Sequence, residues 1–350
     1  MTETLETMQI IGVDIGGANL KAASVDGQAA SRTFAIWRDP ERLAQELSAL
    51  LDDFTVAEAV AVTMTAELAD CFGTKEQGVR RILDAVNDVS AGRPVVVWQT
   101  GGEFVSVADA VEIPRLVAAA NWHALATFAG RLASDGHAVL LDVGTTTTDI
   151  IPLTEGVPVP SGLTDRERLE CGELVYTGVV RSPVCSIVSR LTVGGRPVEV
   201  AAELFATTGD VYLLTGDRDE NPGDLDTANG EPATQTAAAG RLARMICCDT
   251  TELDDGELME MATQIAGKQF ERITAAVDGV VERAFGPGTC DTVLLSGSGA
   301  FLARRLAESH PRLTTARLVD LAECFSGPVA TAACAYATAR LAQERAADFF

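Results

Sequence analysis

The sequence predicts a two-lobed α/β protein with a central cleft. Short apolar runs alternate with segments of helical periodicity, which is typical of a sheet that is parallel in part. Two hairpins, VDIGGANLK and LDVGTTTTDI, share one design: an apolar strand, an aspartate, a glycine-containing turn and a returning strand. Their separation is on the scale of a domain, so they indicate two lobes built on a common plan. The 350 residues are enough to form both.

The composition is that of a folded, acidic protein. Hydrophobic residues make up 47% and charged residues 22% of the chain, which excludes a disordered class. The formal net charge is -23, so neither a phosphate backbone nor an anionic lipid surface would gain counterion release by binding it. We therefore expect no nucleic acid and no membrane among its partners, while assembly into a homo-oligomer stays open.

The N-terminus and the cysteines indicate a cytoplasmic protein. The start, MTETLETMQ, has no basic region ahead of an apolar segment, and no apolar run reaches the roughly 18 residues of a membrane helix. The eight cysteines include no CxxC pair and accompany no histidine cluster. We expect them to be reduced and structural, without a zinc site.

The expected elements follow one another in a regular order. Apolar runs bounded by turn residues predict strands at 9–14, 20–27, 29–36, 57–65, 93–100 and 137–144. Helical spacing predicts helices at 40–54, 75–89, 114–134, 236–248, 257–285 and, rich in alanine, 329–346. A strand, a glycine turn and a helix are expected over 290–310, and exposed loops at 191–198 and 215–232. Lobe I then comprises residues 1–136 and 326–350, and lobe II residues 137–325.

Three glycine turns directly follow apolar strands: DIGGAN at 14–19, DVGTTTTD at 142–149 and SGSGAF at 296–301. Glycine lets backbone amides approach a phosphate closely, and threonine or asparagine adds neutral donors. An aspartate at a strand end can hold a hydrated magnesium ion that touches phosphate oxygens. A hairpin turn also contains glycine without any ligand, so the combination of the three turns predicts a phosphate site better than any one of them.

The order of these turns resembles the phosphate-1, phosphate-2 and adenosine motifs of the actin/hexokinase/Hsp70-like superfamily. The helix that follows Gly327-Pro328 is similar to the second connecting helix of that superfamily. The resemblance implies a ribonuclease H-like, two-lobe fold, with Mg²⁺ as a ligand of the cleft and ATP as a further ligand that stays open.

The blocks between the turns carry a closer resemblance. TMTAELADCFGTKEQGV, DVGTTTTDIIPL, GELVYTGVVRSPV and AAELFATTGDVY resemble the hydantoinase A/oxoprolinase-related family, in particular its short branch linked to tetrahydromethanopterin-dependent one-carbon metabolism. Members of that branch are similar to a transferase of methanofuran biosynthesis. The resemblance implies condensation of a furan-methanamine diphosphate with gamma-glutamyltyramine, which forms an ether and releases diphosphate.

Motif position then predicts the binding residues. Asp14 and Asp142 are expected to hold Mg²⁺ through water. Lys21 is expected to add a point charge to the phosphates, although a lysine on a strand surface would need no ligand. The predicted phosphate-binding residues are Gly16, Gly17, Asn19, Lys21, Gly144, Thr145, Thr146, Thr147, Gly297, Ser298 and Gly299.

Candidate catalytic residues are Asp149, Glu67 and Asp70, together with Lys21. Asp149 lies in an otherwise apolar segment, where a carboxylate needs a partner or a task, so it is the first candidate for a general base. Glu67 and Asp70 follow a buried strand at the expected cleft and compete for the role. A helix cap or a solvated turn would also explain both.

Other polar residues have weaker indications. His123, with Asn121 and Trp122, would line the cleft or simply pack in a core. Arg181 and Ser182 in VVRSPV would contact a carboxylated group such as a glutamyl tail, although a loop arginine is commonly a surface residue.

Three other functions stay open besides the transferase. An ATP-dependent amidohydrolase of the oxoprolinase type and a small-molecule kinase would both use the same three turns. An ATP-gated regulator would need no catalytic carboxylates. The acidic residues retained near the turns favour a catalyst acting on a phosphorylated small molecule.

Overall fold

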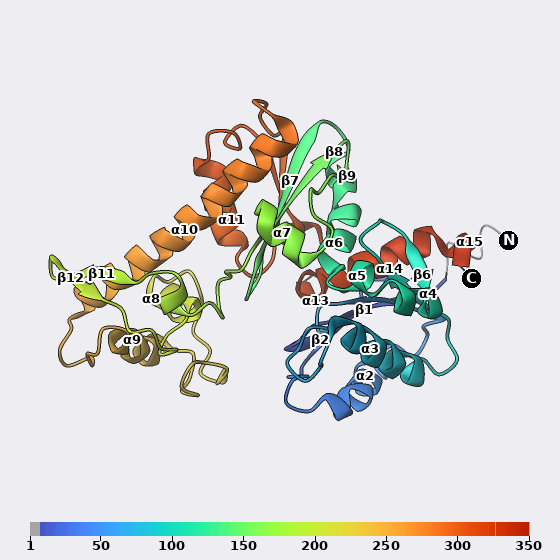
Figure 1. Cartoon of the computed structure of the whole chain (residues 1–350), viewed down its shortest axis with the longest axis horizontal. Helices are drawn as coiled ribbons and strands as arrows, with labels where there is room; N and C mark the ends of the chain where they lie inside the picture. Colours follow the sequence, from blue (N-terminus) through green and yellow to red (C-terminus); the bar gives the residue numbers. More distant parts are fainter. Residues whose placement is uncertain (1–7, 326, 350) are drawn as a thin grey trace. The chain divides into compact units, whose positions relative to one another are not determined.

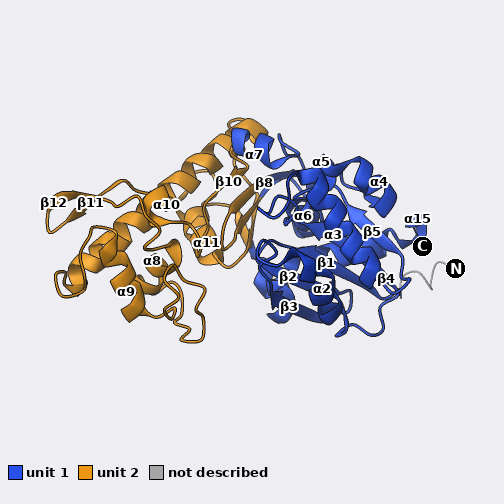
Figure 2. Ribbon diagram, turned by 60° about the horizontal axis from the view of Figure 1, so that its bottom comes forward, with its two compact units in different colours: residues 1–139, 151–171, 319–350 blue, residues 140–150, 172–318 orange. Residues whose placement is uncertain are grey.

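The computed structural model describes residues 8–325 and 327–349 (Figure 1). The chain divides into two compact units (Figure 2): unit 1 is Met1–Val139, Ile151–Cys171 and Val319–Phe350, and unit 2 is Leu140–Ile150 and Gly172–Leu318. This division assigns residues 151–171 to unit 1, whereas the predicted boundaries assign them to lobe II. The lobe boundaries therefore stay a prediction. Residues 1–7, on which part of the N-terminal argument rests, lie outside the described residues.

The sheet of unit 1 has six strands in the order β3-β2-β1-β4-β5-β6. The three central strands, β1 (Ile10–Ile15), β4 (Ala59–Met64) and β5 (Val95–Trp98), are parallel. The outer strands β2 (Asn19–Ser24), β3 (Ala29–Thr33) and β6 (Phe104–Ser106) pair antiparallel with their neighbours. Parallel strands need crossover helices, and α2 (Leu43–Leu51) and α3 (Lys75–Val89) supply them.

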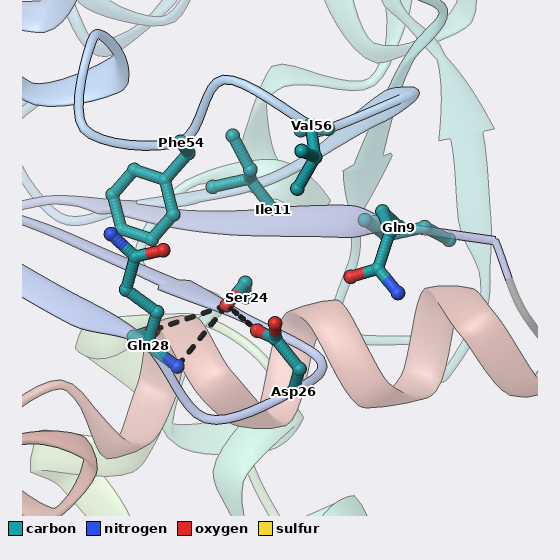
Figure 3. A pocket seen from close by; sticks show the side chains of 9 residues that line it. Gln9, Ile11, Ser24, Asp26, Gln28, Phe54 and Val56 are labelled. Carbon is teal, nitrogen blue, oxygen red and sulfur yellow. Dashed lines mark hydrogen bonds between the residues drawn. The ribbon is translucent and has the colours of Figure 1, made fainter.

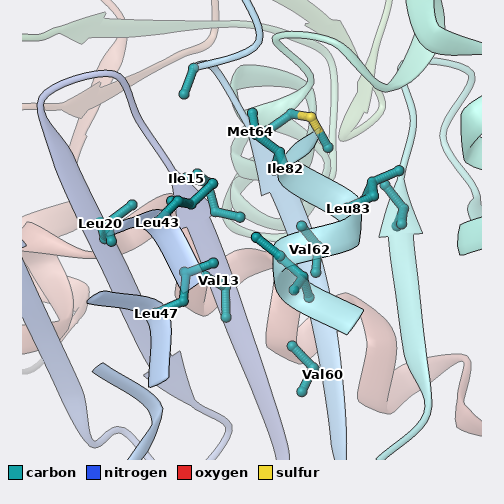
Figure 4. Packing of buried hydrophobic residues seen from close by; sticks show 14 of the residues in the cluster. Val13, Ile15, Leu20, Leu43, Leu47, Val60, Val62, Met64, Ile82 and Leu83 are labelled. Atoms are coloured by element: carbon teal, nitrogen blue, oxygen red, sulfur yellow. The ribbon is translucent and has the colours of Figure 1, made fainter. Parts of the chain in front are cut away.

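One face of this sheet carries the larger hydrophobic core (Figure 4). Side chains alternate along a strand, so Val13 and Ile15 of β1 point to the same face as Val62 of β4. Leu47 of α2 and Ile82 of α3 cover that face. The opposite face of β1 therefore presents Ile10, Gly12 and Asp14.

Helices α6 (Asn121–Ala129) and α14 (Ala333–Glu344) cover the opposite face. At Gly12 an added Cβ would lie 1.8 Å from the carbonyl oxygen of Ala335, so α14 lies directly on the strand there. The remaining elements of unit 1 are η1 (Pro40–Arg42), α4 (Val107–Glu112), α5 (Pro114–Val117), η2 (Gly130–Ala133), β9 (Val157–Pro158), α7 (Asp165–Cys171), α12 (Leu321–Cys324), α13 (Gly327–Thr331) and α15 (Ala346–Phe349).

The second sheet repeats this strand order. It reads β10-β8-β7-β13-β14, formed by β7 (His137–Val143), β8 (Thr148–Thr154), β10 (Leu174–Val175), β13 (Thr292–Ser296) and β14 (Arg317–Asp320). The second sheet also includes β9, which pairs antiparallel with β8. Without β6 in the first sheet and β9 in the second, both sheets have the order 3-2-1-4-5 along the chain, with a hairpin between strands 1 and 2. This is the ribonuclease H-like arrangement, so the predicted actin/hexokinase/Hsp70-like fold class is confirmed.

Four helices belong to unit 2: α8 (Thr208–Leu214), α9 (Gln235–Arg244), the long α10 (Asp255–Phe285; orange in Figure 1) and α11 (Ala300–Ser309). A capping box of Asp254 and Glu257 begins α10. Apolar residues of α8, α9 and α10 form one core, which includes Val211, Leu242 and Ile265.

Some predicted elements differ from the structure. The predicted loop 191–198 is wrong, because β11 (Arg190–Val193) and β12 (Arg196–Glu199) form a hairpin there. Gly194 and Gly195 both have positive φ and make its turn. The expected helices at 114–134 and 329–346 are each divided into shorter ones. In the described part of the chain, no helix is long and apolar enough to cross a membrane.

Replacing Gly12 with alanine should destabilise unit 1, because the new methyl group would overlap the backbone of α14. Overpacking of this kind typically costs about 1–3 kcal/mol in the free energy of unfolding, measured by urea denaturation. Gly267→Ala is the control. Gly267 is an exposed residue inside α10 with no atom within 4 Å of its would-be Cβ. Alanine should stabilise that helix by about 1 kcal/mol. Unchanged stability of Gly12→Ala would contradict the close packing.

Candidate functional site

The turn between β1 and β2 leaves backbone donors free. The Gly16 N–H donates to the Asn19 carbonyl at 3.0 Å, and within the described chain the N–H groups of Gly17 and Ala18 form no hydrogen bond. At Gly16 an added Cβ would lie 2.9 Å from the Asn19 carbonyl oxygen, so the fold itself requires glycine there. At Gly17 it would meet nothing within 4 Å. Packing does not explain Gly17, whereas close approach of a ligand would.

The turn between β7 and β8 has the same construction. The Gly144 N–H donates to the Thr147 carbonyl at 2.8 Å. No hydrogen bond joins the N–H groups of Thr145, Thr146 and Thr147 to any described residue. Successive unpaired N–H groups form a concave site for anions. Each unit therefore has a β-hairpin turn suited to phosphate oxygens: residues 16–19 in unit 1 and residues 144–147 in unit 2. We call these the ribbon turns.

The third glycine turn packs against the second. The Gly299 N–H donates to the Val143 carbonyl at 2.8 Å, and Gly297 has φ +86°. At Gly297 an added Cβ would lie 2.5 Å from Oδ1 of Asp142. The structure thus brings Asp142, the 144–147 turn and the 297–299 turn together in unit 2, and packing alone explains both glycines of the third turn.

Asp14 lies buried at the end of β1, on the face covered by α6 and α14. Burial raises the pKa of its carboxyl group, while Lys21 and the Asn121 side chain act in the opposite direction. Its neighbours in register are Lys21 on β2 and Thr63 on β4. Oδ1 of Asp14 and Oγ1 of Thr63 are both buried without a hydrogen-bond partner among the described residues.

These orphaned oxygens fit a hydrated cation or a ligand donor at Asp14. Isolated buried polar atoms are costly, and a bound Mg²⁺ with its waters would satisfy both. In the described chain no three His, Cys, Asp or Glu side chains gather into a metal-binding group. A magnesium ion here would therefore keep most of its waters, as Mg²⁺ ordinarily does.

Glu67 is a buried carboxylate whose pKa lies near neutrality. It follows β4, in a segment where the Thr65 and Ala66 N–H groups donate to the Ile15 carbonyl, beside Asp14. Its side chain is 1% exposed, and burial raises its pKa to about 7 against smaller opposing effects that include Lys75. Oε1 lies 3.7 Å from the Lys75 Nζ atom, whereas the buried Oε2 has no hydrogen-bond partner among the described residues.

Helices α3 and α7 supply the residues that surround Glu67. Thr74 caps α3 by accepting the Gln77 N–H at 3.1 Å, which fixes Lys75 in the first turn. Gly78 has no room for a Cβ, since one would lie 2.0 Å from the Glu67 carbonyl oxygen. From α7, Asp165 Oδ2 lies 3.7 Å from Lys75 Nζ. Lysine thus bridges two carboxylates.

The other candidate carboxylates have different surroundings. Asp70 is exposed, in the turn before α3. Asp149 is half-buried on β8, where it pairs in register with Leu174 of β10. His123 packs against the rings of Trp98 and Trp122, and burial lowers its pKa to about 4. It is thus neutral and part of a core.

The predicted site residues form two groups. Asp14, the 16–19 turn, Lys21 and Glu67 lie in unit 1, and Asp142, Asp149 and the two remaining turns lie in unit 2.

Sequence reasoning missed Thr63, Lys75 and Asp165. Strand alternation from Val62 places Thr63 on the face of Asp14, so that residue could have been found. Lys75 and Asp165 carried no such signal.

A small hollow lies at the opposite end of β1 (Figure 3). Its lining includes Gln9, Ser24 and Phe54, and its volume is about 10 Å³. Ser24 fills its polar side by bonding to Asp26 and accepting the Gln28 N–H at 3.2 Å. A space for about one water molecule cannot hold a substrate.

Residues 58–345 match the model of the hydantoinase/oxoprolinase family. The chain belongs to this family. It is 30% identical over 341 residues to the (4-{4-[2-(gamma-L-glutamylamino)ethyl]phenoxymethyl}furan-2-yl)methanamine synthase of Methanocaldococcus jannaschii, covering 97% of this chain and 98% of that protein. A synthase of the same name from Methanococcus vannielii is 33% identical over 130 residues, which cover 37% of this chain and 58% of that one.

Among solved structures, the nucleotide-free acetone carboxylase shares the fold. The TM-score is 0.53 at 10% sequence identity, and the match covers 95% of this chain and 70% of that one. At this identity the likeness concerns the fold alone.

Gly17→Ala should retain the stability of the protein and weaken the binding of a diphosphate ester. The methyl group meets no protein atom within 4 Å, yet it would occupy the space before the free N–H groups. Calorimetry with inorganic diphosphate and Mg²⁺ measures the affinity, and urea denaturation measures the stability. Unaltered affinity would remove this turn from the site.

The stability difference between wild type and Glu67→Gln should depend on pH. The folded pKa of about 7 exceeds the ordinary 4.5, so the neutral acid is favoured in the folded state. Its stabilising effect is complete below about pH 4.5 and is lost as the pH rises through about 7. Relative to Glu67→Gln, wild type should lose about 3 kcal/mol over that window, measured by urea denaturation at several pH values. If the stability difference does not vary with pH, the folded pKa of Glu67 is not raised above its ordinary value, and the prediction is wrong.

Proposed function

We propose that this protein is a transferase of methanofuran biosynthesis that joins a furan-methanamine diphosphate to gamma-glutamyltyramine. The observation that carries the proposal is the pair of ribbon turns, each with an aspartate before it and unpaired N–H groups within it. Such turns suit a substrate that brings its own diphosphate. The relative from Methanocaldococcus jannaschii, which matches along nearly its whole length, is named for a phenoxymethyl-furan product.

The reaction exchanges one C–O bond for another. The phenol oxygen of the acceptor forms a bond to the furan methylene carbon, while the bond from that carbon to the diphosphate breaks. The bonding electrons leave with the diphosphate, and the phenol proton passes to a base. In unit 1 the free N–H groups of Gly17 and Ala18, and in unit 2 those of Thr145–Thr147, are each suited to bind diphosphate oxygens and stabilise their growing charge.

Magnesium is the proposed cofactor, held through water by Asp14 and Asp142. When bound, it would neutralise charge on the leaving diphosphate. Lys21, in register with Asp14, opposes the effect of burial on the pKa of that carboxyl group and would add a positive charge to the site. The orphaned oxygens of Asp14 and Thr63 support this assignment.

Glu67 is the base we favour over Asp149 and Asp70. Its pKa of about 7 matches neutral operating conditions, and Oε2 is free to accept a proton. Asp70 is exposed and lacks the buried surroundings of Glu67. Because Glu67 is only 1% exposed, the acceptor must displace a neighbour to reach it, and the flexible side chain of Lys75 is the one suited to move.

A nucleotide-driven reaction is the second candidate. The 297–299 turn has the position of the adenosine motif in the superfamily and lies against Asp142, so ATP is a reasonable ligand of unit 2. An amidohydrolase or a small-molecule kinase would then use the same turns.

One assay separates the candidates. Purified protein with Mg²⁺ is incubated with the furan diphosphate and gamma-glutamyltyramine, and in parallel with ATP alone. We expect ether product and free diphosphate in equal amounts, identified by mass spectrometry, and no ATP hydrolysis. ATP turnover without ether formation would replace the transferase by a nucleotide-dependent enzyme.

The rate of ether formation should rise with pH, with an apparent pKa of about 7 that belongs to Glu67. Glu67→Gln should lower kcat by roughly 10²- to 10⁴-fold and abolish that dependence. Glu76→Gln is the matched control, because Glu76 lies next to Lys75 on α3 with its side chain 65% exposed. A Glu67→Gln enzyme with normal kcat, beside an inactive Asp149→Asn, would transfer the role to Asp149.

A further inference from the structure

Unit 2 contains a pocket lined by two arginines and four hydroxyl-bearing side chains. Its volume is about 320 Å³, and its lining includes Thr146, Tyr176, Arg181, Ser182, Ser186 and Arg272. None of the described residues that line it is acidic, although acidic residues outnumber basic ones by 50 to 27 in the chain. Concentrated positive charge in such an acidic protein indicates an anionic ligand.

One of the two guanidinium groups, that of Arg272, is available for a ligand. Arg272 forms no ion pair or hydrogen bond with any residue of the described chain. Arg181 has an ion-pair partner in Asp226 at 3.6 Å, whose side chain is 75% exposed. Exposed pairs of this length contribute little, so a better-placed anion would displace Asp226.

The backbone beneath the pocket is rigid. Gln269, fully buried on α10, donates to the Gly178 carbonyl and to Thr177 Oγ1, both at 2.8 Å. Ser182 Oγ accepts the Gly178 N–H at 2.8 Å. Arg272 lies three positions beyond Gln269 on the same helix face, so both arginines stand on preorganised backbone.

The pocket adjoins the phosphate turn and has an aromatic edge. Thr146 belongs to both the pocket and the 144–147 turn, and the Arg181 N–H donates to the Thr145 carbonyl at 2.9 Å. Tyr176, directly after β10, is 61% exposed. Its ring offers a flat surface on which another aromatic ring can stack. The volume equals that of about ten water molecules, which leaves enough room for a glutamyl group.

We infer that this pocket binds the carboxylate-bearing end of the aromatic acceptor, with Arg181 and Arg272 holding the α-carboxylate of its glutamyl group. The aromatic ring of the acceptor lies against Tyr176. Arginine pairs with carboxylates through two parallel hydrogen bonds, which fixes the orientation of the ligand. The inference rests on the proposed function and assigns its second substrate to unit 2, beside the turn that binds the diphosphate.

The experiment measures binding by calorimetry, so it needs no turnover. Arg272→Met should weaken the affinity for gamma-glutamyltyramine by about 10- to 100-fold, the range expected for losing a charge-assisted hydrogen bond. Its affinity for the furan diphosphate should change less than twofold. Wild type should bind tyramine, which lacks the carboxylate, at least as weakly as Arg272→Met binds gamma-glutamyltyramine, because tyramine loses the contacts to both arginines. Lys268→Met, which removes an exposed positive charge from the same helix outside the pocket, is the control.

Two results would overturn the inference. One is an unchanged affinity of Arg272→Met for gamma-glutamyltyramine. The other is a selective loss of furan diphosphate binding, which would make the pocket a diphosphate site. Failure of the proposed function looks different: wild type would bind gamma-glutamyltyramine through Arg272 and form no ether with the furan diphosphate.

Discussion

The burial of two carboxylates, Asp14 and Glu67, governs what unit 1 can do. Asp14 lies under α6 and α14 because Gly12, two residues earlier on the same face, lets α14 lie directly on β1. Glu67 follows Thr65 and Ala66, whose N–H groups donate to the Ile15 carbonyl, and it packs against Gly78 of α3. A buried carboxylate must gain a cation, a proton or hydrogen bonds. Here each has an oxygen without a partner, which leaves room for a cation at Asp14 and a proton at Glu67.

The two ribbons show how one backbone design serves both units. In each, the first glycine N–H bonds to the carbonyl three residues later, and the residues between keep their N–H groups free. The side chains differ: unit 1 has Gly17 and Ala18 at these positions, whereas unit 2 has threonines. Backbone amides therefore make the common part of the site, and the threonine hydroxyls add donors only in unit 2.

Much of the fold follows from local sequence. Helix α3 begins and ends at the predicted residues, because Thr74 caps it and its apolar spacing is regular. The β11–β12 hairpin was wrongly predicted as a loop, although Leu191 and Val193 alternate with exposed neighbours and Gly194-Gly195 is a turn signal. Contacts between distant residues could not be predicted. Nothing in the sequence indicates that Asp165 approaches Lys75, or that Arg272 faces the same pocket as Arg181.

A buried base is the chemically sensible one for a phenol. Phenols ionise near pKa 10, so proton transfer to an ordinary glutamate of pKa 4.3 is uphill by about 8 kcal/mol, whereas transfer to an acid of pKa 7 costs about 4 kcal/mol. Burial of Glu67 thus removes half of this cost and still leaves about half of the molecules ionised at neutral pH. The remaining cost is small enough to be met as the diphosphate departs, because the attacking oxygen loses its proton while it gains the bond to carbon. The surroundings that disfavour the Glu67 carboxylate in the folded protein are therefore what make it a useful base.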